Sequence, residues 1–241
     1  RSLGVDTAAK SLPTLIDYAK SAGKRTALIT TDNIMGATPA AFYAHQTDRS
    51  MKAGIEKDLE ESHVDALIFE GEWKTENYAL RENQHFTSFE DYPKQYIRVE
   101  SSNNWQETNL PSWLNQLRTE AGMFVMIENG RIDNHSHGKN LESTLQSVLS
   151  FDRAIGSVIK WMQSNPNTLL IVTADHETGG LVLPDGDIND RKVQGFYYSD
   201  DHTGISVPLF AFGAGASHFG GVYENTMLHD LIRERILRKD Y

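Results

Sequence analysis

Hydrophobic positions along the chain alternate between short continuous runs and stripes at helical spacing. The runs predict buried strands at 26–30, 66–69, 123–127, 168–173 and 207–212. The stripes predict helices at 13–22, 38–44 and 145–162, one that ends at 58–62, and a last one at about 225–238. Pro13 and Gly23 bound the first of these helices, as start and stop residues commonly do.

Strands that alternate with helices predict an α/β fold with a mostly parallel central sheet and helices on both faces. A chain of 241 residues is long enough to bury one core, so we interpret residues 1–241 as a single domain with surface insertions. Residues 71–110 are polar, weakly patterned and dotted with aromatic side chains, and are predicted to be a surface insertion or lid. A second polar insertion is expected between the strands at 168–173 and 207–212.

Charge and cysteine content narrow the classes of function. The chain has 33 Asp and Glu against 23 Lys and Arg, a formal net charge of -10. Such a surface repels nucleic acid and anionic lipid, so neither a nucleic acid nor a membrane is expected as a partner. The absence of cysteine excludes disulfides, thiolate zinc sites and cysteine nucleophiles. No apolar run approaches the roughly 20 residues that span a bilayer.

Carboxylates and imidazoles follow two of the predicted strands. The strand at 123–127 leads into Glu128, Asp133 and His137, and the strand at 168–173 leads into Asp175 and His176. In a parallel sheet, functional sites lie beyond the carboxyl ends of the strands. Imidazole nitrogen with carboxylate oxygen suits zinc, whereas oxygen alone suits magnesium. Each cluster by itself is an ordinary helix cap or polar loop, but two clusters after two buried strands favour a metal site.

Four segments resemble motifs of the alkaline phosphatase family. They are ATPAAFYAHQTDR at 37–49, VMIENGRID at 125–133, VTADHETG at 172–179 and HTG at 202–204. The likeness runs from about residue 3 to the C-terminus, is weakest over 71–110, and keeps the order of the motifs in the family. It implies two zinc ions and one magnesium ion at a single hydrolytic site.

The resemblance also implies a role for each matching residue. The matches are Asp133, His137 and His202 for the first zinc ion, Asp175 and His176 for the second, Thr38 and Glu128 for magnesium, and Arg49 for the phosphate group. A planar guanidinium can bind two phosphate oxygens at once, which lysine cannot do. Two metal ions about 3.5–4 Å apart can stabilise both the attacking and the leaving oxygen.

The chain departs from common family patterns at three places. Gly36 and Asn134 stand where relatives often carry side chains close to the magnesium ion and the phosphate group. The family's nucleophilic serine, and an aspartate shared by the second zinc ion and magnesium, correspond to positions before Arg1. Asp32 and Asn33 follow the first strand, but neither replaces that serine. We therefore expect residues 1–241 to need a preceding segment of the same protein for catalysis.

The predicted function is metal-dependent hydrolysis of small-molecule phosphate monoesters through a phosphoseryl intermediate. Arg49 favours a monoester, because a dianionic phosphoryl group gains most from a bidentate cation. The alternatives are a phosphodiesterase or phosphonate hydrolase on the same scaffold, and a non-catalytic metal-binding fragment. The resemblance further implies a homodimer and a periplasmic or extracellular location.

Overall fold

The computed structural model describes residues 2–81, 85–100 and 104–238. Within the predicted single domain, the chain forms two compact units. The sheet unit comprises residues 1–105, 109–128 and 222–241, and the hairpin unit comprises residues 106–108 and 129–221.

The sheet unit is built on five parallel strands in the order β3-β4-β2-β1-β5. The strands are β1 (Arg25–Thr30), β2 (Ala66–Phe69), β3 (Ala79–Leu80), β4 (Gln95–Arg98) and β5 (Met123–Glu128). The predicted strands at 26–30, 66–69 and 123–127 are β1, β2 and β5. The predicted α/β fold with a parallel central sheet is therefore confirmed.

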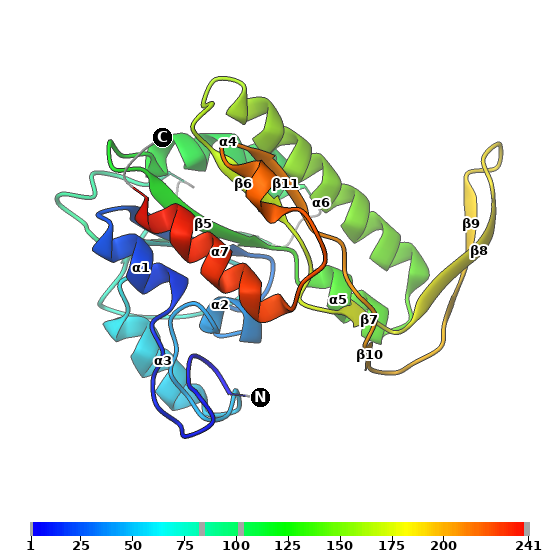
Figure 1. Cartoon of the computed structure of the whole chain (residues 1–241), viewed down its shortest axis with the longest axis horizontal. Helices are drawn as coiled ribbons and strands as arrows, with labels where there is room; N and C mark the ends of the chain where they lie inside the picture. The colour runs from blue at the N-terminus through cyan, green and yellow to red at the C-terminus, as the bar shows by residue number, and fades with distance from the viewer. Residues whose placement is uncertain (1, 82–84, 101–103, 239–241) are drawn as a thin grey trace. The chain divides into compact units, whose positions relative to one another are not determined.

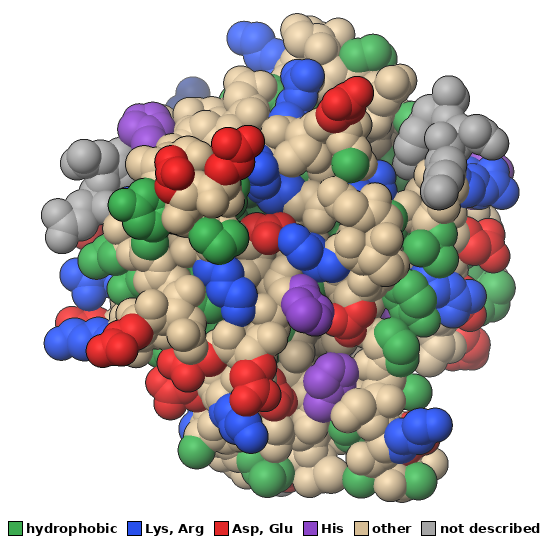
Figure 2. Space-filling model, turned by 90° about the vertical axis from the view of Figure 1, so that its left-hand side faces the viewer, with side chains coloured by type: hydrophobic (Ala, Val, Ile, Leu, Met, Phe, Trp, Pro, Cys, Tyr) green, Lys and Arg blue, Asp and Glu red, His purple; other side chains and the backbone are tan. Residues whose placement is uncertain are grey.

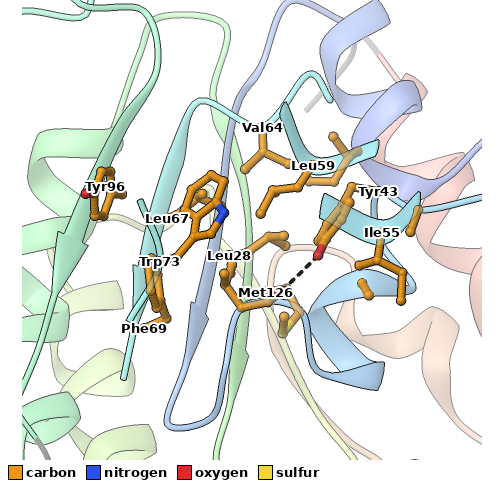
Figure 3. Close-up of a cluster of buried hydrophobic side chains, with 14 of the residues drawn as sticks. Leu28, Tyr43, Ile55, Leu59, Val64, Leu67, Phe69, Trp73, Tyr96 and Met126 are labelled. Atoms are coloured by element: carbon orange, nitrogen blue, oxygen red, sulfur yellow. Dashed lines mark hydrogen bonds between the residues drawn. The ribbon is translucent and has the colours of Figure 1, made fainter. Parts of the chain in front are cut away.

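Side chains alternate across the pleat of each strand, so the register produces one apolar row on each face of the sheet. The two rows are Met126–Leu28–Leu67–Tyr96 and Ile127–Ile29–Ile68–Ile97. Figure 3 shows Leu28, Leu67 and Tyr96 among the buried side chains of the first row's face. The Tyr43 hydroxyl donates to the carbonyl of Ile34 at 2.9 Å within this core. Burial raises the pKa of Tyr43 far above its ordinary value, so the hydroxyl stays protonated as a donor.

Helices of the sheet unit close the core around these strands. They are α1 (Leu15–Ser21), α2 (Ala37–Ala40), α3 (Lys52–Glu61), α4 (Trp105–Leu117), whose residues 106–108 belong to the hairpin unit, and α7 (Asn225–Leu237). Thr14 and Asp17 form a capping box that begins α1. In Figure 1, α1 lies beside α7, and Leu15 and Ala19 pack against Ile236. The predicted helix at 38–44 is shorter than expected, because α2 ends at Ala40 and turns follow.

Part of the segment 71–110 belongs to the sheet. β3 and β4 lie here and pair in parallel with each other, and β4 also pairs with β2. Trp73, Tyr78 and Phe86 of this segment are buried. The buried side chain of Gln95 accepts hydrogen bonds from the Thr87 N–H at 2.9 Å and the Arg81 guanidinium at 2.8 Å. A role as an insertion or lid stays a prediction, but the segment also supplies core and edge strands.

The hairpin unit consists of two helices, three antiparallel strand pairs and a 3-10 turn. Its elements are α5 (Arg131–His137), α6 (Leu141–Met162), β6 (Leu169–Val172), β7 (Glu177–Thr178), β8 (Leu181–Asp187), β9 (Lys192–Tyr197), β10 (His202–Thr203), β11 (Phe210–Gly213) and η1 (Ala216–Phe219). β8 and β9 form the long hairpin of Figure 1, inside the predicted second insertion.

The strand β6 differs from its prediction. The continuous apolar run at 168–173 indicates a strand buried in a parallel sheet, but β6 is only half-buried and pairs antiparallel with β11. Among the described residues β11 is its one ladder partner. The apolar run identified the strand correctly, but it carried no information about which strands flank it.

On the face shown in Figure 2, acidic and basic side chains are interspersed rather than gathered into a patch of one sign. Within the described ranges, no helix is both long and apolar enough to cross a membrane.

Candidate metal centre

Three potential metal ligands meet in the hairpin unit. Asp133, His137 and His202 each offer one ligand atom, and these atoms all lie within 4.8 Å of one another. Asp133 and His137 are four residues apart on α5, so the helical repeat brings both side chains to one face. His202 comes from β10, 65 residues beyond His137. The structure thus brings together the three residues that the sequence predicts for the first zinc ion.

The distances between these ligand atoms fit a tetrahedral ion. His137 Nε2 lies 3.1 Å from His202 Nε2, and the two nitrogens lie 3.4 and 3.5 Å from Asp133 Oδ1. A tetrahedral zinc ion with bonds of about 2.0–2.1 Å separates its ligand atoms by about 3.3 Å. Asp133, His137 and His202 are between 36% and 40% exposed, so the cluster is open to solvent and small molecules.

The ring of His137 is oriented by a carbonyl group. His137 Nδ1 lies 3.1 Å from the backbone oxygen of Asp200, which can only accept, so Nδ1 carries the hydrogen. In the neutral imidazole, Nε2 then presents its lone pair to the cluster. Lys139, just beyond α5, holds the Asp200 carboxylate at 2.5 Å and keeps the pKa of Asp200 below its ordinary value. A metal-binding histidine is commonly oriented through its second nitrogen in this way.

A two-residue ladder positions His202. β7 and β10 pair antiparallel, with His202 opposite Thr178 and Thr203 opposite Glu177. Glu177 accepts hydrogen bonds from the Thr203 hydroxyl and from the Leu181 N–H, which lies 3.1 Å away. Partial burial raises the pKa of Glu177, but the hydrogen bonds outweigh it and leave the pKa lowered. Glu177 therefore stays ionised and fastens the two strands together.

Asp175 and His176 form a second pair beside the first cluster. Their side chains approach at 3.0 Å, between Asp175 Oδ2 and His176 Nε2. The imidazole of His176 stacks on that of His202, with ring centroids 3.4 Å apart and an angle of 17° between the rings. The residues predicted for the second zinc ion thus contact the residues predicted for the first.

Thr178 connects the two groups and was not predicted as a site residue. Its hydroxyl donates its one hydrogen to Asp133 Oδ1, and Oγ1 lies 3.3 Å from His176 Nδ1. With that hydrogen committed, Oγ1 can accept from His176 Nδ1–H, and in a neutral ring this tautomer keeps a lone pair on Nε2. That lone pair faces the Asp175 carboxylate, an arrangement that a cation would stabilise. Thr178 lies inside the quoted motif at 172–179, but a threonine in a polar loop gives no signal by itself.

We expect Thr178→Val to lower zinc affinity by about 10–100-fold, because hydrogen bonds to metal ligands typically contribute that much. Valine keeps the shape of threonine and removes both hydrogen bonds. Zinc affinity can be measured by competition with a chromogenic chelator. Thr226→Val, at an exposed position of α7, is the control. Equal affinities in the two variants would show that Thr178 does not orient the cluster.

The remaining predicted site residues lie in the sheet unit. Glu128 ends β5, and its carboxylate accepts a hydrogen bond of 2.5 Å from the Thr30 hydroxyl at the end of β1. Thr38 is half-buried in α2, and Arg49 is exposed just before α3. Arg49 lines the same hollow as Asp32 and Ala37, which follow the carboxyl end of β1. Asn134 is exposed on α5 in the hairpin unit.

Gly36 leaves no room for a side chain in its present surroundings. A Cβ atom there would lie 2.9 Å from the Asn33 carbonyl oxygen and 3.3 Å from Asp32 Oδ2. The Gly36 N–H donates to the same carbonyl at 2.7 Å, so this oxygen cannot move away without losing a hydrogen bond. Gly36 therefore lies in a turn between β1 and α2 where a Cβ atom would crowd the Asn33 carbonyl oxygen.

Gly36→Ala should lower the free energy of unfolding by about 1–3 kcal/mol, the usual cost of overpacking. Gly156 provides the opposite case, because it lies within α6 and a Cβ there would meet nothing within 4 Å. Gly156→Ala should raise the free energy of unfolding by roughly 0.5–1 kcal/mol, since alanine loses less entropy in a helix. Urea unfolding of both variants measures these changes. A change in the free energy of unfolding with the same sign in both variants would contradict this expectation.

The α/β fold holds an Asp-His-His cluster that could bind a metal ion, and comparison with known proteins identifies the family. The sequence profile described as alkaline phosphatase matches residues 1–69 and 112–192. The chain belongs to the alkaline phosphatase family.

Individual relatives match over most of this chain. Alkaline phosphatase 4 of Bacillus subtilis is 26% identical in an alignment 213 residues long, and the match covers 76% of this chain and 46% of that protein. The alkaline phosphatase of Escherichia coli is 23% identical in an alignment 322 residues long, and the match covers 94% of this chain and 68% of that protein. The chain thus spans about half the length of the Bacillus subtilis relative.

Solved structures agree with the fold. The alkaline phosphatase from the Antarctic bacterium TAB5 superposes with a TM-score of 0.82 at 24% identity, over 97% of this chain and 78% of that one. At this identity the likeness supports the fold rather than any particular chemistry.

Proposed function

We propose that the protein carrying this chain hydrolyses phosphate monoesters at a centre with two zinc ions and one magnesium ion. The single observation that carries this proposal is the cluster of Asp133, His137 and His202, with ligand-atom separations of 3.1–3.5 Å. The chain's family and the adjoining pair of Asp175 and His176 support it further.

Each group of residues would have a distinct task. Asp133, His137 and His202 would hold one zinc ion, and Asp175 and His176 would hold the other. Bound zinc supplies positive charge at the attacking and leaving oxygens of the phosphoryl group. Thr38 and Glu128 would hold magnesium through oxygen, the ligand it prefers. A mutant of the TAB5 alkaline phosphatase has magnesium bound, which is consistent with such a site in this family.

Arg49 would bind the phosphoryl group itself. Its guanidinium is exposed and has no hydrogen bond or ion pair with another side chain in the part of the chain that the structure describes. It is thus available to donate two parallel hydrogen bonds to two phosphate oxygens.

The phosphoryl acceptor would be a serine outside residues 1–241. Asp175 and His176 leave the second zinc ion with two ligands from this chain, and Thr38 and Glu128 leave magnesium with two. An aspartate from the same outside segment would complete both sites. Residues 1–241 alone should therefore show no turnover of an aryl phosphate with zinc and magnesium present. Robust turnover by residues 1–241 would place the nucleophile within this chain.

The reaction class can be tested by comparing two substrates with the same leaving group. The complete gene product, loaded with zinc and magnesium, is assayed with an aryl phosphate monoester and with the corresponding diester. We expect kcat/KM to be higher for the monoester. A higher value for the diester would support a phosphodiesterase on the same scaffold. Zinc binding without turnover of either ester would support a non-catalytic protein.

A homodimer and a periplasmic or extracellular location are proposed on the same family basis. Light scattering of the complete protein tests the first, and fractionation of the source cells tests the second.

A further inference from the structure

A small hollow in the sheet unit contains two cationic side chains. It has a volume of about 260 Å³ and is lined by Asp32, Gly36, Arg49 and Lys52, among others. Asp32 follows β1, Gly36 precedes α2, and Lys52 is the first residue of α3, so three separate segments form the walls. Ligand pockets commonly measure about 300–1,000 Å³, so this hollow suits a small group rather than a large leaving group.

The charges in this hollow do not neutralise one another. Lys52, like Arg49, has no ion pair or side-chain hydrogen bond within the described ranges. Asp32 uses one carboxylate oxygen to accept the Asn33 N–H at 2.7 Å and forms no ion pair with either cation. Two positive charges and one negative charge therefore face the same space in a chain whose net charge is -10.

The positive charge of Lys52 also lies where its own helix does not stabilise it. It lies at the N-terminus of α3, where the helix dipole places positive charge. The first turn of α3 contains no acidic residue, and the N-cap Met51 makes no side-chain cap hydrogen bond. By comparison, Lys57 of the same helix pairs with Glu61 at 3.8 Å. The local helix thus provides no stabilising role for the charge of Lys52.

We propose that Lys52 is a second phosphate-binding cation, which acts with Arg49 to select dianionic monoesters over monoanionic diesters. This inference rests on the proposed function, because it assigns the hollow to the phosphoryl group of the same substrate. Arg49 supplies a planar fork, and Lys52 supplies a compact charge that can reach a remaining oxygen. Two cations can each pair with a charged oxygen of a dianion, whereas a diester carries one negative charge and an additional bulky group.

The test measures binding of inorganic phosphate to the zinc-loaded complete protein by calorimetry, together with monoester and diester kinetics. Lys52→Ala should weaken phosphate binding by about tenfold, near the lower end for a hydrogen bond between charged groups because the site is exposed. KM for the monoester should rise while kcat changes little, since a ground-state contact is lost. The kcat/KM for the diester should fall less than that for the monoester.

Two further variants distinguish binding from a structural effect. Lys52→Arg keeps the positive charge and should retain phosphate affinity within about threefold. Lys57→Ala changes a lysine on the same helix outside the hollow and should leave phosphate affinity unchanged. The melting temperature of Lys52→Ala should not fall, because the lost charge opposes the helix dipole.

An unchanged dissociation constant for phosphate in Lys52→Ala, or an equal loss in Lys57→Ala, overturns the inference. The proposed function fails by a different result, namely a wild-type protein that does not hydrolyse the monoester. Phosphate binding is measured at equilibrium without turnover, so the two failures can be told apart.

Discussion

Asp133→Ala and His202→Ala are each expected to remove about one of two bound zinc ions per chain and to lower kcat/KM by more than about 100-fold. Residues that only orient metal ligands typically contribute 10–100-fold, and a ligand itself contributes more. Either substitution would leave the proposed first zinc site with two of its three protein ligands. An ion held by two ligands exchanges readily with solvent, so elemental analysis after dialysis will report its loss.

Asp133→Ala has a further consequence that His202→Ala lacks. Asp133 Oδ1 is the acceptor for the Thr178 hydroxyl, and Thr178 also contacts His176. Without the carboxylate, this hydroxyl is free to donate elsewhere, and the tautomer of His176 is no longer fixed. We therefore expect Asp133→Ala to weaken the second zinc site as well.

His218→Ala is the matched control for loss of an imidazole. His218 is exposed on η1, outside the cluster, and its ring contacts the carbonyl of Gly215 at 3.1 Å. The zinc content and kcat/KM of the His218→Ala variant should equal those of the wild type. Two zinc ions retained in both Asp133→Ala and His202→Ala would show that the cluster at α5 and β10 is not a zinc site.

Strands with uninterrupted apolar runs could be predicted from the sequence, because parallel strands are buried on both faces. β1, β2 and β5 were found in this way. β4 was not, since its first residue Gln95 is polar although fully buried. Hydrogen bonds from Thr87 and Arg81 satisfy the Gln95 side chain, and such long-range partners cannot be read from local sequence.

Some residues of the candidate site could be predicted from the strand pattern, and others only from the resemblance to a family. Asp133 and Asp175 follow apolar strands, so the topology rule identified both clusters. His202 follows no apolar strand and was predicted only through the resemblance. Its approach to Asp133 depends on the ladder between β7 and β10, a contact between residues 26 apart. Lys52 gave no signal, because its significance comes from the hollow that it shares with Arg49.

The second large effect is expected at Arg49, where alanine should lower kcat/KM for a phosphate monoester by roughly 100-fold. Two hydrogen bonds between charged groups contribute about 1.5–3 kcal/mol each, and solvent at this exposed position reduces their sum to about 3 kcal/mol. Inorganic phosphate should inhibit the variant correspondingly less, because Arg49 would contact the oxygens in the ground state and the transition state alike.

The charge and the geometry of Arg49 can be separated by a second substitution. Arg49→Lys keeps the positive charge but offers no fork for two oxygens, so it should recover only part of the lost kcat/KM and phosphate affinity. Arg153→Ala is the control, because Arg153 forms a surface ion pair with Glu107 at 3.0 Å, and such pairs contribute little. Phosphate inhibition that is unchanged in Arg49→Ala would assign Arg49 to the surface. In that case, Lys52 alone could not distinguish a dianion from a monoanion by matching its charge, and the preference for monoesters would need another explanation.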